Sequence, residues 1–256
     1  MRTPFHRFSV MLLALFSTVC FAAPEEIQVY MDEFAEKGKF GLDLHTNYVI
    51  SAQPGSVTRR MLRVTPELSY GINDNLEVGL YYLTSIGPEQ GKGSPVTDGG
   101  KIRFKYRPRA PIATEPWYFA VNFELGKLAR RFNADGNSAE VKLIGLYRTG
   151  PWAVGANLNV DRSLRRQPFQ GATSELDMKI GYRLKSEEEG GLQLGIENYS
   201  FLGPIRNQGL PSSRTASTFL VADFSFAKWD LNVGIGRSTG ITPDRVILKA
   251  IIGVPI

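Results

Sequence analysis

Cysteine is scarce in this 256-residue sequence, which contains Cys20 alone, and histidine occurs only twice. We expect Cys20 to be removed with an N-terminal signal peptide, so the mature chain would have no disulfide, no cysteine zinc site and no thiol nucleophile. The N-terminal apolar run is well short of the roughly 20 residues that a spanning helix needs. These shortages exclude a disulfide scaffold, thiol catalysis and an N-terminal membrane anchor.

The N-terminus has the three parts of a secretory signal. Basic residues at Arg2, His6 and Arg7 precede the apolar stretch 10–16, and small residues at the minus-three and minus-one positions, Cys20 and Ala22, predict cleavage after Ala22. The bulky residue before the cysteine argues against a lipoprotein. Residues 1–22 are therefore predicted to be a signal peptide, and its loss lowers the formal charge from +5 to about +3.

Apolar and polar residues alternate with a period of two from Phe40 onward, in runs of about ten residues. This is the length that a tilted transmembrane strand needs. Residues 23–39 are polar, show no clean period and are predicted to be a periplasmic lead-in. The strands are predicted near 40–49, 61–70, 76–86, 100–107, 117–126, 139–148, 152–161, 175–184, 191–200, 216–226, 229–237 and 246–255.

The connections between these strands alternate in length. The long ones are 51–60, 87–98, 127–138, 162–173 and 202–215, and most of the others are short. Bacterial outer-membrane barrels have short periplasmic turns, longer extracellular loops and an even number of strands. A soluble β-sandwich is the alternative, but its strands are usually shorter. Residues 40–256 are thus predicted to form an all-β transmembrane antiparallel barrel of about twelve strands, with both termini periplasmic.

Aromatic residues and the final strand point to the same membrane. Tyr and Trp favour the membrane interface, and they fall near strand ends or on the outward face at Tyr48, Tyr70, Tyr82, Tyr106, Trp117, Tyr147, Trp152, Tyr182 and Trp229. The last strand resembles the C-terminal targeting strand of outer-membrane barrels, although it ends in Ile256 rather than in an aromatic residue. The expected location is the bacterial outer membrane, and the expected partners are its lipids and the barrel-assembly machinery.

If the apolar face of each strand contacts lipid, a densely charged face points into the lumen. The predicted lumen-lining residues are Arg63, Glu67, Lys101, Arg103, Lys105, Arg107, Glu124, Lys142, Asp177, Lys179, Arg183, Asp223 and Lys249. One hypothesis is a basic ladder that guides an anionic solute through a water-filled pore. The other is a network of ion pairs across a narrow barrel, which the near balance of the two signs favours. A narrow channel beside the pairs would satisfy both.

The predicted extracellular loops are rich in arginine. Arginine binds phosphate through two parallel hydrogen bonds, and lipopolysaccharide in the outer leaflet carries phosphate. Contacts with lipid phosphate are predicted for Arg59, Arg60, Arg130, Arg131, Arg165 and Arg166. The alternative is solvated loop charge without a fixed partner. Nothing in the sequence resembles an element that reads nucleic acid.

The sequence offers little material for catalysis. His45 is the one histidine of the mature chain, and it lies on the lumen face of the first strand beside Asp43 and Asn47. Barrel hydrolases hold a nucleophile, a base and an orienting group together near the outer rim, and no such set is evident. His45 is expected to be a hydrogen-bonded lumen residue. No catalytic, metal or cofactor site is predicted.

Four short stretches resemble a known group of proteins. They are Glu26–Tyr30 (EIQVY), Phe40–Tyr48 (FGLDLHTNY), Thr65–Gly71 (TPELSYG) and Leu76–Tyr81 (LEVGLY). They are similar to the start of proteobacterial outer-membrane barrels grouped with the phenol meta-pathway, and the resemblance implies uptake of small, aromatic compounds. The leading hypothesis is a passive or selective channel for small anionic or aromatic solutes. A closed structural or lipopolysaccharide-contacting barrel is the alternative, and a barrel enzyme comes third.

Overall fold

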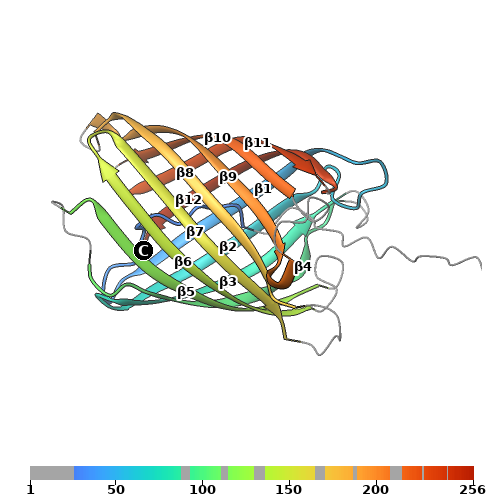
Figure 1. Cartoon of the computed structure of the whole chain (residues 1–256), viewed down its shortest axis with the longest axis horizontal. Coiled ribbons are helices and arrows are strands. Elements are labelled where there is room, and N and C mark those ends of the chain that lie inside the picture. The colour runs from blue at the N-terminus through green and yellow to red at the C-terminus, as the bar shows by residue number, and fades with distance from the viewer. Residues whose placement is uncertain are drawn as a thin grey trace, which may run out of the picture.

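Twelve antiparallel strands close into a single barrel, in a computed structural model that describes residues 26–87, 93–110, 115–129, 136–164, 171–186, 189–207, 215–226, 228–240 and 242–256. Each strand pairs with its neighbours in sequence, and β1 pairs with β12 to complete the ring. The strands run obliquely around the barrel (Figure 1). The predicted all-β barrel of twelve strands is confirmed. Within the described ranges, no helix is long and apolar enough to cross a membrane.

The strands have the length expected for crossing a bilayer at a tilt, with 11 to 13 residues each. They are β1 (Phe40–Ala52), β2 (Leu62–Asn73), β3 (Leu76–Ile86), β4 (Val96–Tyr106), β5 (Trp117–Leu128), β6 (Asn137–Thr149), β7 (Trp152–Ser163), β8 (Thr173–Lys185), β9 (Leu192–Pro204), β10 (Thr215–Phe226), β11 (Trp229–Gly240) and β12 (Asp244–Pro255). The predicted centres are right, whereas β4 begins earlier and β9 ends later than the alternation suggested. A short 3-10 helix, η3 (Ile205–Asn207), follows β9.

The two ends of the barrel differ in their connections. The turns β2–β3, β6–β7 and β10–β11 are short and lie at the end where β1 begins and β12 ends, which we call the turn end. The opposite end, which we call the loop end, holds the β1–β2 connection. There Thr58 donates a hydrogen bond to Asp244 at the start of β12. The turn end is therefore the compact end of the barrel.

The outward face of the wall is apolar and exposed, as a lipid-facing surface must be. Large apolar side chains project from it on successive strands, including Leu80 with 52% of its surface exposed and Leu220 with 64%. Aromatic pairs gather at the turn end, where the ring centroids of Trp117 and Tyr147 are 4.4 Å apart and those of Trp152 and Tyr182 are 4.8 Å apart. This arrangement is typical of an aromatic girdle at a membrane interface.

Candidate functional site

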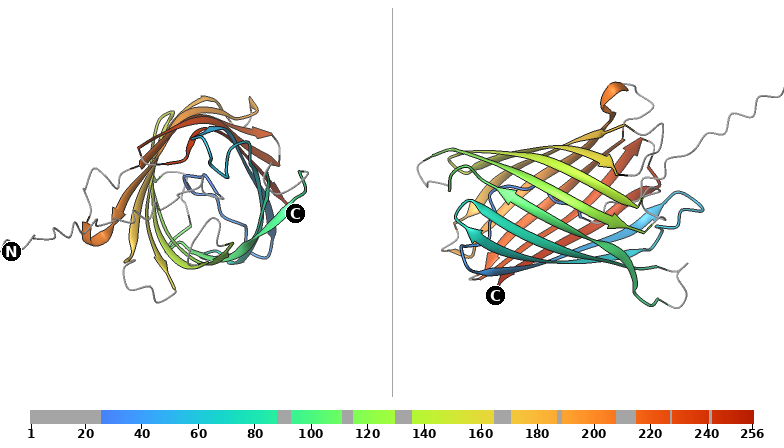
Figure 2. Two further views of the ribbon diagram at one scale, coloured as in Figure 1. Left: turned by 90° about the vertical axis from the view of Figure 1, so that its right-hand side faces the viewer. Right: turned by 90° about the horizontal axis from the view of Figure 1, so that it is seen from below.

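The lumen is filled in part by a segment that precedes the barrel. Figure 2 (left) shows residues 26–39, in blue, inside the ring of strands, and we call them the lumen segment. The sequence predicts a periplasmic lead-in at residues 23–39, but the described part of this stretch, from residue 26 onward, lies inside the barrel. The physical reason is that its apolar side chains and its acids both find partners on the lumen wall, as the contacts below show.

Glycine at position 71 joins the lumen segment to the turn end. The amide of Gly38 donates to the carbonyl of Gly71 (2.7 Å), and the amide of Gly71 donates to the carbonyl of Lys39 (3.1 Å). Lys37 and Gly71 also form a parallel β-bridge. A Cβ atom at position 71 would come within 2.3 Å of the Glu36 carbonyl oxygen, so the close approach of the two backbones requires glycine.

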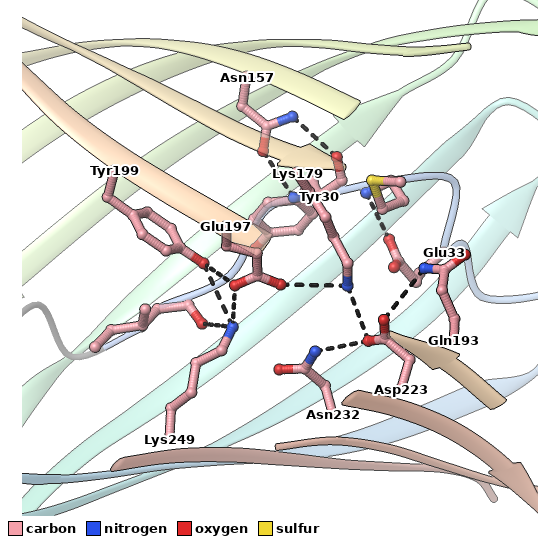
Figure 3. A network of polar contacts seen from close by, with 12 residues as sticks. Tyr30, Glu33, Asn157, Lys179, Gln193, Glu197, Tyr199, Asp223, Asn232 and Lys249 are labelled. Carbon is pink, nitrogen blue, oxygen red and sulfur yellow. Dashed lines mark hydrogen bonds and ion pairs between the residues drawn. The ribbon is translucent and has the colours of Figure 1, made fainter. Parts of the chain in front are cut away.

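A second attachment lies deeper in the lumen, on β7. The side-chain oxygen of Asn157 accepts a hydrogen bond from the backbone amide of Tyr30 (2.7 Å), and its side-chain nitrogen donates to the carbonyl of Tyr30 (2.9 Å). Figure 3 shows both bonds. The amide group of Asn157 thus pairs with the segment backbone as a neighbouring strand would. Because Asn157 is fully buried, these bonds replace contacts that the backbone would otherwise make with water.

Three apolar residues of the segment, Ile27, Val29 and Met31, are buried in the lumen. They belong to one apolar cluster with inward-facing wall residues, namely Val49, Tyr118, Ala120, Ile144, Leu146, Ala153, Tyr199, Phe219, Val221 and Ile247. Gly155 on β7 leaves room for them, because a Cβ atom there would come within 2.3 Å of the Met31 sulfur. The wall surface therefore fits the apolar side chains of the segment.

Basic residues of the wall bind the segment from several strands. Lys249 of β12 donates to the Ile27 carbonyl (3.0 Å), and Lys105 of β4 donates to the Glu33 carbonyl (2.8 Å). Arg148 of β6 pairs with the Asp32 carboxylate (2.5 Å). Residues 26–34 contain three acids and no base. Residues 26–34 and the basic side chains that bind them are thus complementary in charge.

Tyr30 contacts both hydrogen-bonding groups and cations of the lumen. Its hydroxyl group donates to the Glu26 carboxylate (2.5 Å) and lies 2.7 Å from the Tyr81 hydroxyl. Burial, followed by the nearby Glu26 charge, raises the pKa of the Tyr30 hydroxyl well above its ordinary value, so it stays a donor. Its ring centroid is 4.3 Å from Lys142 Nζ, 4.7 Å from Lys105 Nζ and 5.7 Å from Arg103 Cζ. These distances are within the range of cation–π attraction.

The wall beside Tyr30 carries a cluster of ion pairs on β1 to β4. Arg103 Nε donates to Glu67 Oε1 (2.5 Å), and Arg103 Nη1 is 2.5 Å from Glu77 Oε1. Gly79 on the intervening strand leaves the space through which Arg103 reaches Glu67. His45 Nε2 is 3.4 Å from Glu67 Oε2. All these charged side chains are buried, so each must be paired.

A second cluster occupies the lumen face of β8 to β12 (Figure 3). Glu197 lies at its centre, 3.2 Å from Lys179 Nζ, in contact with Lys249, and it accepts a hydrogen bond from the Tyr199 hydroxyl (2.7 Å). Lys179 also binds Asp223 (2.8 Å), which Asn232 and Gln193 contact from their own strands. Lys249 therefore joins this wall cluster to the lumen segment.

A looser group lies between them, on β4 to β8. Lys101 is 3.5 Å from Glu124, which also accepts a hydrogen bond from Asn122 (2.7 Å). Lys142 is 3.5 Å from Glu140, and on the next strands Asn159 donates to Asp177 (2.6 Å). The partners within these ion pairs are further apart than those of Arg103, so the two lysines are less tightly held.

Most predicted lumen residues of the described strands point inward, and nine are largely buried: Arg63, Glu67, Arg103, Lys105, Glu124, Lys142, Asp177, Lys179 and Lys249. Two predicted residues lie at the rim. Arg107 follows β4, donates to the Asp74 carbonyl (2.8 Å) and stacks on Phe34, and Arg183 is exposed near the turn end. Arg59 and Arg60 are exposed at the loop end. The other predicted phosphate contacts, Arg130, Arg131, Arg165 and Arg166, lie outside the described residues.

Titratable residues of the lumen wall are held in pairs and clusters. His45 is buried against the Glu67 carboxylate at mid-wall, with its ring 6.3 Å from that of Tyr81. In the part of the chain that the structure describes, no group of three histidine, cysteine or acidic residues could hold a metal ion. The lumen contains paired charges, aromatic rings and residues 26–39 of the chain itself.

Comparison with known proteins supports the fold. No family model matches the sequence, and no curated protein sequence does. Among solved structures, the COG4313 outer membrane channel from Pseudomonas putida F1 superposes with a TM-score of 0.60 at 15% identity, covering 90% of this chain and 100% of that one. The KdgM porin in complex with disordered oligogalacturonate gives 0.53 at 11% identity, covering 84% and 97%. The chain thus has the fold of bacterial outer-membrane barrels, which supports an outer-membrane location.

Proposed function

We propose that the protein is an outer-membrane channel for small solutes, passive or selective, whose lumen is closed by its own residues 26–39. The observation that carries the proposal is that a segment separate from the wall occupies the lumen. The wall is closed without it, since β1 pairs with β12. The segment can therefore move out of the lumen while the hydrogen bonds between strands stay intact.

The solute class follows from the wall and from the resemblance in sequence. A charged interior behind an apolar outer face is typical of channels that pass polar solutes. The two superposable structures, a channel and a porin, are consistent with this. The stretches similar to barrels of the phenol meta-pathway favour an aromatic solute, and the basic side chains around the segment favour an anionic one.

We place the turn end in the periplasm, because short turns face that side in bacterial barrels. The N-terminal signal would be cleaved after Ala22, and the barrel-assembly machinery would insert the chain. At the opposite end, the exposed guanidinium groups of Arg59 and Arg60 are positioned to contact lipopolysaccharide phosphate. We propose no catalytic activity, because His45 is buried beside Glu67 within the wall.

A closed structural barrel is the second candidate, and the wall clusters favour it. Arg103 is held by two glutamates, and Glu197 is held by two lysines, all largely buried. Buried pairs of this kind resist separation, because breaking one leaves an uncompensated charge. If these clusters alone fill the lumen, removing the segment would not open a path.

Single-channel conductance in planar bilayers separates the two candidates. We expect a signal-cleaved variant that lacks residues 23–33 to stay open for most of the recording, with an open probability at least about tenfold above that of the intact protein. Gly155→Val, which forces Met31 away from the wall, is expected to act in the same direction. Gly145→Val is the matched control, because a Cβ atom there has no neighbour closer than 3.8 Å. Folded variants that never conduct would establish the closed barrel.

A further inference from the structure

The residues that surround Tyr30 form a binding site, and they belong to the barrel wall. The groups that contact its side chain and backbone come from β3, β4, β6 and β7: Tyr81, Arg103, Lys105, Lys142 and Asn157. All of them are buried to more than nine-tenths. Tyr30 itself belongs to the lumen segment, which is not one of the barrel strands. It therefore occupies the site as a bound ligand would.

We infer that this site binds a small aromatic acid with a para hydroxyl group, and that Tyr30 occupies it when the lumen is closed. This inference rests on the proposed channel function and names the solute class of that channel. Solute and segment would then compete for one position, so binding of the solute would favour release of the segment.

The requirement for an aromatic ring follows from the three cations around Tyr30. Lys142 and Lys105 place their ammonium groups within 5 Å of the ring centroid, and Arg103 lies somewhat further away. A π system attracts such cations, and the attraction is stronger where water is excluded. A saturated ring of the same size would fill the space without this attraction.

The requirement for the two polar groups follows from the two ends of the tyrosine side chain. At one end, the Tyr30 hydroxyl lies 2.7 Å from the Tyr81 hydroxyl, so a phenolic group has a partner there. At the other end, the side-chain nitrogen of Asn157 donates to the Tyr30 carbonyl. With the segment gone, that donor faces the lumen. A carboxylate in the para position of the solute would accept its hydrogen bond.

The requirement for negative charge follows from what the segment removes when it leaves. Residues 26–34 take three acids with them and no base. Lys105 then loses the Glu33 carbonyl and Lys249 loses the Ile27 carbonyl. The wall is left with buried cations that lack part of their coordination, and an anionic solute restores it.

Calorimetric titration with 4-hydroxybenzoate tests the inference on the refolded, signal-cleaved protein in detergent. Tyr30→Ala vacates the site, and we expect its Kd for 4-hydroxybenzoate to be at least tenfold lower than that of the wild type. Phe34→Ala is the matched control: it removes another ring of the segment, one that stacks on Arg107 at the rim, and should bind as the wild type does. Phenol lacks the carboxylate, and cyclohexanecarboxylate has a saturated ring in place of the aromatic one and lacks the hydroxyl group. Each should bind Tyr30→Ala at least tenfold more weakly than 4-hydroxybenzoate does.

Equal affinity of the three proteins, or equal binding of cyclohexanecarboxylate, would overturn the inference. A second measurement covers the case in which Tyr30→Ala fails to fold. In the wild type, millimolar 4-hydroxybenzoate should accelerate amide hydrogen exchange in residues 26–34, and unchanged exchange would also overturn it. Binding is measured here without conductance. Conducting variants that do not bind the acid would refute only this inference, whereas binding without conductance would refute only the channel.

Discussion

The barrel wall and the lumen segment belong to one chain, but they are held by different contacts. The wall consists of twelve strands in a continuous ring of backbone hydrogen bonds. The segment is held by a few points: the backbone at Gly71, the side chain of Asn157 and single bonds from basic residues. Segments with few backbone contacts open at lower free energy than the sheets around them. The proposed closure of the lumen would thus be a separate property from the stability of the barrel.

Removing the central acid of the wall cluster should have the largest effect on stability. Glu197→Gln leaves Lys179 and Lys249 buried without their shared carboxylate. We expect the free energy of unfolding to fall by about 3–5 kcal/mol, as when one partner of a buried pair is lost. Urea unfolding of the protein in lipid vesicles measures this change. Asp230→Asn is the control, since Asp230 is exposed and accepts only a hydrogen bond from Ser225 among the described contacts.

A loss below about 1 kcal/mol for Glu197→Gln would contradict this account of the wall. It would mean that water reaches the two lysines, so that the cluster lines an open path even with the segment in place. The wall cluster would then be accessible to water, and release of the segment would not be needed to open the lumen.

The wall was predictable because its pattern repeats. Alternation predicts Lys101, Arg103 and Lys105 on the lumen face of β4 and Phe104 on the lipid face. In the structure Arg103 and Lys105 are buried, Lys101 is half-buried and Phe104 is exposed. Only a period of two and an apolar solvent are needed for that prediction. Which acid each base meets was not predictable. Arg103 reaches Glu67 across an intervening strand, and that depends on the stagger of the strands and on a glycine between them.

The lumen segment was missed because its signal is short. Ile27, Val29 and Met31 do alternate with polar residues, but only three apolar positions do so, and acids interrupt the run. Its main partner, Asn157, is 127 residues away in sequence. The sequence does not distinguish Asn157 from Asn159, two positions further along the same strand. Only the closed barrel shows that Asn157 binds the segment and that Asn159 binds Asp177.

The two asparagines of β7 sharpen the comparison between segment and wall. Asn157→Ala removes two hydrogen bonds to Tyr30, each worth about 1 kcal/mol net, so we expect amide exchange in residues 26–34 to rise about 30-fold. Hydrogen exchange with mass spectrometry measures it. Asn159→Ala is the matched control, because Asn159 donates to Asp177 within the wall. Equal acceleration in both variants would show that the segment responds to any defect in β7 and has no specific clamp.

The smallest effect is expected at the rim, where the segment meets water. Arg148 and Asp32 are both partly exposed, with 38% and 27% of their side-chain surfaces accessible, so their ion pair should contribute only about 0.2–1 kcal/mol. Arg148→Gln should therefore accelerate exchange in residues 32–36 by about fivefold at most in low salt, and the difference should vanish near 1 M NaCl, where such pairs are screened. An acceleration as large as that of Asn157→Ala, persisting in high salt, would move the main attachment of the segment from mid-lumen to the rim. The Tyr30 site would then be opened by events at the turn end, and a solute in the lumen would have less influence on closure than its competition with Tyr30 implies.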